Sequence, residues 1–516
     1  MNRKPKWLML TLSAGLALSA TACGSSNEKE NTAASPGAST APASVAPSAS
    51  NAPKPELRAL SIWQKDDYNT YPVAKVIEEK TGYKVKYDML PADKSEDKLN
   101  LLISSAEPYD AITIGGNKAL YADYAKKGAL VDLGPLIDKY GPNIKASVSQ
   151  ESFDAVKVDG KIYAIPMRAV EFSSTSLMVR KDWVDKLGMQ MPTTIDEFTA
   201  LLKAFKEKDP GGNGDKNAAM TIKGDTPLIE NLVGAFGMPN SWSALDGKLV
   251  PRPLHPGFKD YLTYVADLYK QGLLDKEFAV NKDATMKEKF TSGKAGVIAL
   301  NWADIPTIGD ALNKNFPDAK FAYLPILKGK DGKAGLNANS GFDRITFIPK
   351  ASKNPEEAIK WMNAKLEKDT FREIAIGVEG KHYTLKDGQY TPILPIFTDE
   401  RNQANNYLTG VDEKNYPIYW QARVQKDARL FEGWSYLNKV MPATMRIADP
   451  LGVAPVLPTF SKENAQLNQL TNDFAVKVIV GEEPVASVDT FATKYKSAGG
   501  DASYKEVNDW YATAKK

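Results

Sequence analysis

Strand-like and helix-like spacing of apolar residues alternate along the early part of the chain. Short β-rich or alternating runs occupy residues 57–63, 83–90 and 110–114, and apolar residues recur at helical spacing in residues 71–80 and 99–103. The order is therefore strand, helix, strand, helix, strand. Such an order predicts an α/β fold with a parallel sheet that helices cover on both faces.

The loops after the first and third predicted strands are candidate ligand sites. Ligands of parallel sheets bind beyond the carboxyl ends of the strands. These loops, residues 63–69 and 115–118, contain Trp63, Asp66 and Asn117. We expect these three side chains to contact a ligand.

Helix starts are marked clearly in the later part of the chain. Thr194 and Glu197 have the spacing of a capping box, and apolar residues follow on one face. Asn354 precedes Pro355 and two acidic residues, which is typical of an N-cap and a first helical turn. We expect one helix to begin at each position.

Composition and charge exclude several classes of function. The 66 basic and 63 acidic residues differ by three, and the first 22 residues carry three basic and no acidic side chains. The chain therefore lacks the excess of basic residues that would indicate nucleic acid as a partner. The single cysteine excludes disulfides and cysteine-based zinc sites within the chain, and the two histidines, His255 and His382, make a histidine-rich zinc site an unfavoured interpretation.

The first 56 residues predict a membrane anchor. A basic start, a short apolar run from Trp7 to Ala17 and small residues precede Cys23, which is the layout of a bacterial lipoprotein signal (residues 1–22) with lipidation of Cys23. Lipoprotein signals usually carry Leu at the third position before the cysteine, where this chain has Ala20. An ordinary secretory signal is the alternative interpretation. Residues 31–53 hold 17 Ala, Ser or Pro among 23, so residues 23–56 are expected to be a disordered tether on the extracellular face of the cell membrane.

Five sequence blocks carry a family resemblance. They are VDGKIYAIP (158–166), VRKDW with KLG and PTT (179–194), FTSGKAGVIALNW (290–302), NPEEAIKWM (354–362) and GVEGKHY (377–383). Their order and spacing resemble those of family 1 extracellular solute-binding proteins, the lipid-anchored substrate-binding components of Gram-positive carbohydrate ABC importers. The resemblance covers nearly the whole chain after the tether.

This resemblance implies a fold, a domain division and a function. The fold is two-lobed and periplasmic-binding-protein-like (type II), with each lobe a sheet flanked by helices and with crossing hinge strands. Lobe 1 would comprise residues 57–168 and about 335–400, and lobe 2 residues 169–334 and 401–516. The implied function is capture of an oligosaccharide between the lobes of a monomer and its delivery to ABC permease subunits, without catalysis and without a required cofactor.

Sugar chemistry extends the set of candidate ligand residues. Aromatic rings stack on the apolar faces of pyranoses, and Arg, Asp, Glu, Asn and indole N–H groups bind the hydroxyls. Trp302 resembles the stacking tryptophan of the family, while Trp183 and Trp361 fall on apolar helix faces and are expected in the core. The remaining candidates are Arg168, Trp242, Phe342, Arg344, Glu379, Tyr419 and Trp434. A loop hydrogen-bond network is the alternative for Glu379.

Residues 209–217, DPGGNGDKN, resemble a calcium loop. Oxygen ligands would come from Asp209, Asn213, Asn217 and the carbonyl of Asp215. Gly211 stands where a side-chain ligand is usual, and Thr221 stands where a bidentate Glu is usual. A structural Ca²⁺ is therefore one interpretation, and a Gly/Asn turn after a helix is the other.

Two other functions stay open at this stage. A secreted glycosidase would share the anchor and the aromatic residues, but it needs two carboxylates at a fixed separation. A peptide-binding receptor of the same fold would use charged groups for peptide termini. Aromatic platforms without a carboxylate pair would favour sugar binding.

Overall fold

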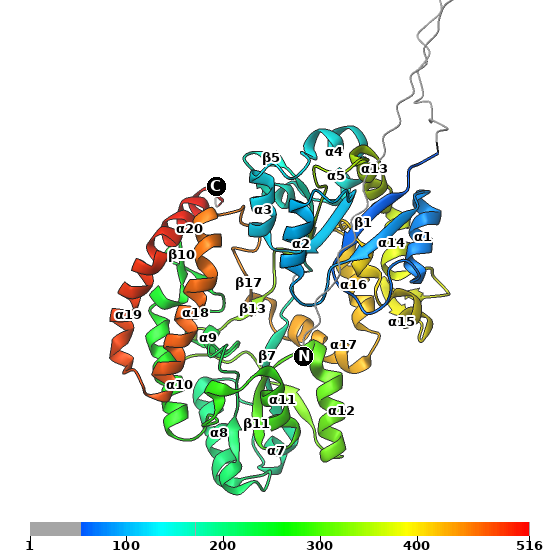
Figure 1. Cartoon of the computed structure of the whole chain (residues 1–516). Coiled ribbons are helices and arrows are strands. Elements are labelled where there is room, and N and C mark those ends of the chain that lie inside the picture. Colours follow the sequence, from blue (N-terminus) through cyan, green and yellow to red (C-terminus); the bar gives the residue numbers. More distant parts are fainter. Residues whose placement is uncertain (1–52, 171, 515–516) are drawn as a thin grey trace, which may run out of the picture. The chain divides into compact units, whose positions relative to one another are not determined.

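The computed structural model describes residues 53–170 and 172–514, so the predicted signal, Cys23 and almost all of the tether lie outside the described residues. Residues 54–516 form one compact unit. Its helices and strands gather around two larger sheets, one of five strands and one of four (Figure 1). This confirms the expected α/β architecture.

The five-stranded sheet contains the three strands expected first. Its order is β2 (Val85–Met89), β1 (Leu57–Ser61), β3 (Ala111–Gly115), β14 (Phe342–Phe347) and β6 (Ala164–Arg168). β1 pairs in parallel with β2 and β3, as the alternating order predicts. β14 runs antiparallel to β3 and β6, and it arrives from a distant part of the chain.

Helices α1 (Pro72–Thr81) and α2 (Ser95–Ser104) connect these strands as expected. Gly82 ends α1 with a left-handed φ of 70°, which a glycine adopts at little cost. Other elements around this sheet are α3 (Lys118–Lys126), α4 (Gly134–Tyr140), α5 (Pro142–Ser147), α6 (Gln150–Asp154), α13 (Pro355–Lys365), α14 (Lys368–Ile376), α15 (Ile396–Arg401), η5 (Ala404–Tyr407), α16 (Tyr416–Val424), and the hairpins β4 (Lys157–Val158) with β5 (Lys161–Ile162) and β15 (Tyr383–Lys386) with β16 (Gln389–Pro392).

The four-stranded sheet has the order β12 (Phe321–Tyr323), β7 (Thr175–Arg180), β11 (Ala295–Asn301) and β8 (Ala218–Met220). The elements that accompany it are α7 (Lys181–Lys186), α8 (Ile195–Lys208), α9 (Leu232–Ala235), the hairpin β9 (Trp242–Leu245) with β10 (Lys248–Pro251), η2 (Arg252–Leu254), α10 (Gly257–Lys270), η3 (Phe278–Val280), α11 (Asp283–Thr291), η4 (Trp302–Asp304), α12 (Ile305–Asn315), α17 (Ala428–Ser435), η6 (Tyr436–Val440), α18 (Pro458–Val480), α19 (Val488–Tyr495) and α20 (Asp501–Ala514).

The chain crosses between the sheets several times. It leaves the first sheet after β6, and it returns through β13 (Leu336–Ala338), which pairs in parallel with β17 (Arg446–Ala448). Figure 1 shows these two short strands between the groups of elements around each sheet. The hinge strands expected from the resemblance therefore correspond to β6, β7, β13 and β17.

The apolar cores follow the two sheets. One core joins β1, β6 and α13 to Tyr407, Tyr416 and Ala422, so residues 404–422 pack with the first sheet. The second and third join β7 and β11 to α8, α10, α17 and α18. This packing differs from the expected lobe boundary near residue 400, because burial of Tyr416 and Tyr419 keeps α16 on the first sheet.

The predicted helix starts differ in their chemistry. Thr194 and Glu197 form the expected capping box of α8. Asn354 occupies the N-cap of α13, but its side chain makes no capping bond. Its amide instead lies 3.3 Å from Asp110 Oδ1, which ties the helix start to the end of the loop before β3.

Candidate functional site

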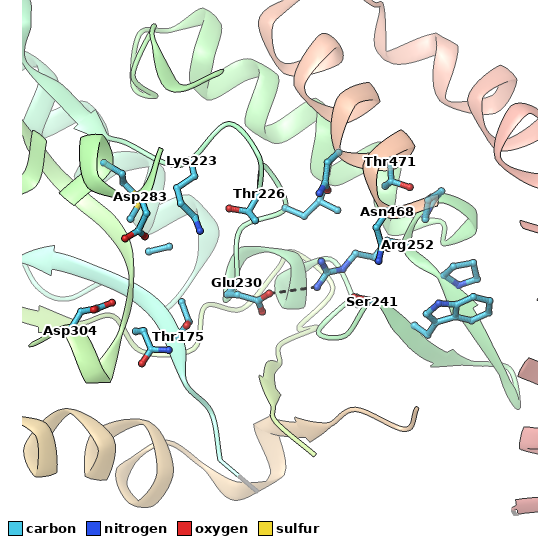
Figure 2. Close-up of a pocket in the computed structure, with 18 of the residues that line it drawn as sticks. Thr175, Lys223, Thr226, Glu230, Ser241, Arg252, Asp283, Asp304, Asn468 and Thr471 are labelled. Atoms are coloured by element: carbon cyan, nitrogen blue, oxygen red, sulfur yellow. Dashed lines mark ion pairs between the residues drawn. The ribbon is translucent and has the colours of Figure 1, made fainter. Parts of the chain in front are cut away.

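A polar cavity of about 480 Å³ lies beside the second sheet. The start of β7, the end of β11, residues 223–230, η2, α11 and α18 all contribute to its lining (Figure 2). We call it the polar pocket. Its lining is rich in amide and charged side chains: Lys223, Glu230, Arg252, Asp283, Lys287, Asn301, Asp304, Asn468 and Asn472.

Lys287 holds two carboxylates at one wall of the polar pocket. Its ammonium lies 2.7 Å from Asp283 and 3.0 Å from Asp304. Burial alone would lower the pKa of Lys287, but the bonds to Asp283 and Asp304 outweigh burial and raise it. Lys287 is therefore held in its charged form between the two carboxylates and is not free to pair with other groups.

Glu230 and Arg252 form a second, looser pair across the pocket. Glu230 Oε1 lies 3.9 Å from the guanidinium, and Figure 2 shows the two side chains directed toward each other. Arg252 also donates to the carbonyls of Asn240 and Pro239, at 3.2 and 3.4 Å. Glu230 Oε2 is buried and has no hydrogen-bond partner among the described residues. Burial raises the pKa of the Glu230 carboxyl, and Arg252 opposes that shift.

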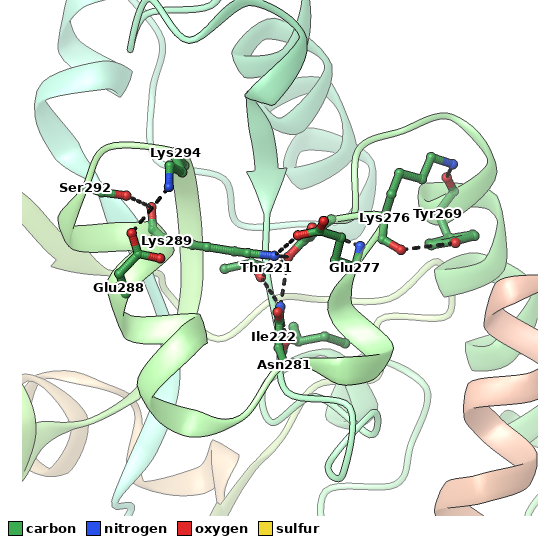
Figure 3. Close-up of polar contacts among 11 residues, drawn as sticks. Thr221, Ile222, Tyr269, Lys276, Glu277, Asn281, Glu288, Lys289, Ser292 and Lys294 are labelled. Atoms are coloured by element: carbon green, nitrogen blue, oxygen red, sulfur yellow. Dashed lines mark hydrogen bonds and ion pairs between the residues drawn. The ribbon is translucent and has the colours of Figure 1, made fainter.

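A polar network beneath the pocket fixes the loop that carries Lys223. The Asp275 carboxylate accepts hydrogen bonds from Thr221 (2.7 Å), Asn281 (2.8 Å) and Lys289 (2.8 Å), which Figure 3 shows converging from separate elements. Burial alone would raise the pKa of Asp275, but these bonds outweigh it and lower the pKa. A Cβ at Gly224 would lie 2.0 Å from a backbone oxygen, so only glycine allows this close approach.

A smaller cavity of about 380 Å³ lies beside the first sheet, where β1, β2 and β3 end. We call it the apolar pocket, because Ile62, Trp63, Leu90 and Ile114 contribute much of its wall. The Trp63 side chain is 52% exposed. This is the place at which the sheet topology predicts a ligand.

Asn117 reaches the apolar pocket but is already bonded. It is the N-cap of α3, where its Oδ1 accepts from the Leu120 amide at 3.1 Å. Its Nδ2 donates to Glu96 at 2.8 Å. A ligand contact by Asn117 would therefore replace or share one of these bonds.

Lys118 links the surroundings of the two pockets. Its ammonium, at the start of α3, donates to the carbonyls of Gly452 and Ala454. Ala454 packs with Trp242 in one apolar cluster, and Trp242 lines the polar pocket. A continuous chain of contacts therefore runs from α3 on the first sheet to the wall of the polar pocket.

An aromatic cluster adjoins the polar pocket at the end of β11. Ring centroids of Trp302 and Trp420 are 5.6 Å apart, Phe172 and Trp420 4.8 Å, and Trp420 and Trp434 6.1 Å. Trp302 stands between the pocket-lining residues Asn301 and Asp304. The indole nitrogens of Trp302 and Trp434 are buried, and neither has a hydrogen-bond partner within the described ranges.

The predicted ligand residues thus fall into different places. Trp63 and Asn117 line the apolar pocket, Trp242 lines the polar pocket, and Trp302 and Trp434 belong to the aromatic cluster. Trp242, Trp302 and Trp434 are all more than nine-tenths buried. Trp242 lines the polar pocket, whereas Trp302 lies in the chain between its lining residues Asn301 and Asp304 and packs in a different apolar cluster.

The other predicted residues line neither pocket. Asp66 bonds Gln403 at 2.9 Å, Arg168 pairs with Glu151, and Arg344 bonds Asn406 at 2.8 Å. Phe342 lies under Lys118, whose ammonium is 5.5 Å from the ring centroid.

Tyr419 and Glu379 also lie apart from the pockets. Tyr419 is 4% exposed and packs against Tyr390 in the first core. Glu379 is an exposed loop residue. Neighbouring His382 is buried and bonds Glu400 at 2.9 Å, so the loop carries the hydrogen-bond network considered as the alternative.

Sequence reasoning missed most of the polar pocket. Glu230, Arg252 and Asp283 belong to a loop, a short helix and a helix start that have no motif of their own. Asn301 was the one residue with a usable signal, because it ends a strand that precedes a predicted ligand residue.

The expected calcium loop follows α8, as the capping pattern implies. Asp209 Oδ1 and Asn217 Oδ1 are both buried without a hydrogen-bond partner among the described residues, which fits oxygen ligands for a cation. Asp209 Oδ2 accepts from the Gly214 amide at 2.7 Å, and Asn213 donates to the Gly293 carbonyl. Among the side chains that the structure describes, no group of three or more His, Cys, Asp and Glu could hold a metal ion.

Comparison with known proteins places these features in a family context. A family model described as bacterial extracellular solute-binding protein matches residues 63–369. Lipoprotein LipO of Bacillus subtilis is 29% identical over 470 residues, which are 86% of this chain and 89% of LipO.

Solved structures with similar folds have lower identity. The S. pneumoniae ABC-transporter substrate-binding protein FusA in complex with kestose has a TM-score of 0.68 and 21% identity, and the match covers 89% of this chain and 99% of FusA. Alginate-binding protein AlgQ2, solved without calcium ion, has a TM-score of 0.63 and 23% identity, over 90% of this chain and 99% of AlgQ2. These likenesses confirm the two-lobed fold.

Proposed function

The chain belongs to the bacterial extracellular solute-binding protein family, and from that premise we propose that it is the carbohydrate-binding component of an ABC importer that captures an oligosaccharide. A member of this family binds its solute and does not transform it. The proposal therefore assigns recognition to the pockets and no catalytic step.

The observation that carries this proposal is the joining of the polar pocket to the aromatic cluster. Sugars present a belt of hydroxyls and apolar C–H faces, so they need planar hydrogen-bonding groups beside aromatic rings. The polar pocket offers Glu230, Arg252 and several amides, and Trp302, with its unpartnered indole N–H, lies in the chain between the lining residues Asn301 and Asp304. Trp434, with its own unpartnered N–H, is a second donor in this proposal.

The apolar pocket supplies the opposite face of the site in this proposal. Trp63 would cover a sugar ring from the first lobe, while the polar pocket binds the hydroxyls from the second. A ligand that touches both lobes stabilises the closed arrangement over the open one, and the permease would recognise that arrangement. We propose the lobe division predicted from the sequence, with lobe 1 as residues 57–168 and about 335–400, to which the packing of residues 404–422 with the first core adds α16.

Asp66, Arg168, Phe342, Arg344, Glu379 and Tyr419 stay predicted ligand residues without a place in either pocket. Their side chains would reach ligand only after the lobes move. Substitution of Tyr419, buried in the first core, is expected to reduce stability before it affects binding.

We also propose that Cys23 carries the membrane anchor. In the part of the chain that the structure describes, no helix is long and apolar enough to cross a membrane. LipO, a relative, is itself named a lipoprotein. Replacement of Cys23 by Ser should release the protein from the membrane fraction into the medium. Retention of the Cys23→Ser protein in the membrane would contradict the anchor.

A structural Ca²⁺ is a further part of the proposal. Asp209, Asn213, Asn217 and the carbonyl of Asp215 would hold the ion, which would connect the end of α8 to β8. Ca²⁺ should raise the melting temperature, and Asn217→Ala together with Asp209→Ala should remove that increase. Equal melting temperatures with Ca²⁺ and with a chelator would exclude the site.

A thermal-shift screen of the purified protein tests the central proposal. Plant, algal and host-glycan oligosaccharides would be compared with peptides, and a ligand at 100 times its dissociation constant should add about 2.7 kcal/mol of stability. Recovery of the sugar intact would agree with a receptor. Stabilisation by peptides alone would replace sugar with peptide as the ligand class, and cleavage of the sugar would contradict the assignment as a binding protein.

A further inference from the structure

Charge pairing in the polar pocket is asymmetric. Lys287 is neutralised by Asp283 and Asp304, and Arg252 is engaged by two backbone carbonyls. Glu230 is left with a long 3.9 Å contact to Arg252 on one oxygen and no partner for the other. The pocket therefore contains a buried hydrogen-bond acceptor that the described residues do not satisfy.

Lys223 is the cation that could balance this carboxylate. No described residue forms a hydrogen bond or an ion pair with its ammonium, and Figure 2 shows the side chain extending into the pocket from the loop above Glu230. The separation of Lys223 from Glu230 exceeds the 4.0 Å that defines an ion pair. Lys223 can therefore donate to a ligand without first breaking a bond.

We propose that the polar pocket selects a neutral sugar unit, whose hydroxyl groups donate to Glu230 and accept from Lys223, and that it excludes uronate and sialate units. The inference rests on the proposed function, since it presumes that the ligand is a carbohydrate. The inference adds the chemical class of the ligand, a neutral sugar unit, and the residue that determines this class, Glu230.

Solvation explains why a neutral unit is favoured. A carboxylate with one long ion pair and one unsatisfied oxygen gains most from O–H donors, and adjacent hydroxyls of one sugar ring can bind both carboxylate oxygens. A uronate would bring a second carboxylate beside Glu230, and two like charges in a poorly solvated pocket repel. The pocket already contains three carboxylates and three cations, so it has no net positive charge to offset that repulsion.

Burial of Glu230 agrees with this assignment. The elevated pKa that burial gives this carboxyl reflects the cost of keeping it charged without donors. Hydroxyl donors from a ligand would remove much of that cost. The unsatisfied oxygen of Glu230 therefore favours a donor-rich ligand over an anionic one.

The experiment compares matched neutral and acidic oligosaccharides by calorimetric titration of the purified protein. Suitable pairs are galactose with galacturonate oligomers, mannose with mannuronate oligomers, and milk oligosaccharides with and without sialic acid. The proteins are the wild type, Glu230→Gln, Lys223→Met and the control Glu482→Gln, which alters an exposed carboxylate on the same lobe. Unliganded melting curves confirm that each variant folds.

We expect the wild type to bind at least one neutral member about 100-fold more tightly than its acidic counterpart. Loss of a charged acceptor should make Glu230→Gln about 10- to 100-fold weaker for the neutral sugar, and Lys223→Met a few-fold weaker. Glu482→Gln should match the wild type. If Glu230→Gln fails to fold, the affinity of the wild type for neutral sugars relative to acidic sugars still tests the inference.

Three results would overturn the inference in different ways. Tighter binding of an acidic member, lost in Lys223→Met, would reverse the ligand class and leave the proposed function intact. Unchanged affinity in a folded Glu230→Gln protein would remove Glu230 as the determinant. Absence of binding to every sugar of either class would reject the proposed function together with the inference.

Discussion

The polar pocket and the apolar pocket present different groups, although each lies where strands of a sheet begin or end. The polar pocket holds six charged side chains, most of them fixed by ion pairs or by backbone carbonyls. The apolar pocket presents Trp63, half exposed, and its one acidic residue, Glu96, is engaged by Asn117. The polar pocket offers directed hydrogen bonds, and the apolar pocket offers apolar surface area.

This difference indicates a division of roles between the lobes. Directed, pre-formed hydrogen bonds discriminate between ligands, because a ligand that cannot reproduce them leaves buried groups unpaired. An exposed ring stacks on many sugar faces with little discrimination. We expect lobe 2 to determine specificity and lobe 1 to add affinity on closure.

The largest effect is expected when the polar network beneath the polar pocket loses its central carboxylate, Asp275. Asp275→Ala deprives Thr221, Asn281 and Lys289 of their acceptor, so stability should fall by about 3 kcal/mol, and sugar affinity should fall because the loop of Lys223 loosens. Chemical denaturation and titration measure the two effects. Asp267→Ala, on the exposed face of α10, is the control.

The same variant makes a prediction about pH. Because the folded-state pKa of Asp275 is lowered, its contribution to stability is complete above its unfolded value of about 3.9 and is lost as pH falls through the folded pKa. The stability gap between wild type and Asp275→Ala should therefore narrow below about pH 4. A gap that is constant down to pH 2 would contradict the role assigned to this carboxylate.

The second variant tests the aromatic edge of the polar pocket. Trp302→Phe removes the unpartnered indole N–H and keeps a ring, so sugar affinity should fall about tenfold while stability falls by about 1 kcal/mol. Trp183→Phe, in the core behind the second sheet, should reduce stability without reducing affinity. Equal affinities for wild type and Trp302→Phe would place the ligand away from this ring.

A smaller effect is expected in the apolar pocket. Trp63→Ala should weaken binding three- to tenfold, because it removes one stacking face, and should leave stability within about 0.5 kcal/mol. The affinity should fall by the same factor for every sugar that binds. Leu101→Ala, an exposed apolar residue of α2, is the control. A change in ligand preference would show that lobe 1 also discriminates.

The last variant tests the link between the pockets, and its readout is the pH dependence of stability and not sugar affinity. Burial lowers the pKa of Lys118 to about 8, against the opposing charge of Asp449. The folded protein then binds this proton more weakly than the unfolded chain, so stability of wild type relative to Lys118→Met should rise between pH 8 and 10.5 and stay flat below pH 8. Melting curves at several pH values measure the difference, and parallel curves would contradict it.

Local sequence signals predicted the framework because they report on local causes. The alternation that predicted β1, α1, β2, α2 and β3 depends on which side chains face the core, and the capping box at Thr194 depends on three neighbouring residues. The same reasoning predicted the position of Trp63 in the wall of the apolar pocket, because the end of a parallel strand is a fixed place in an α/β sheet, and its contact with a ligand stays a prediction. Asn354 shows the limit, since a distant partner, Asp110, replaced its capping bond.

The sequence alone was enough to predict the α/β class, the family and the strand ends of the first sheet where a ligand is expected. It could not predict that Glu230, Arg252 and Asp283 line one pocket, or that α16 packs with the first sheet. Pairing of charges and burial of aromatic rings depend on contacts between residues far apart in the chain. Periodicity and capping carry no record of such contacts.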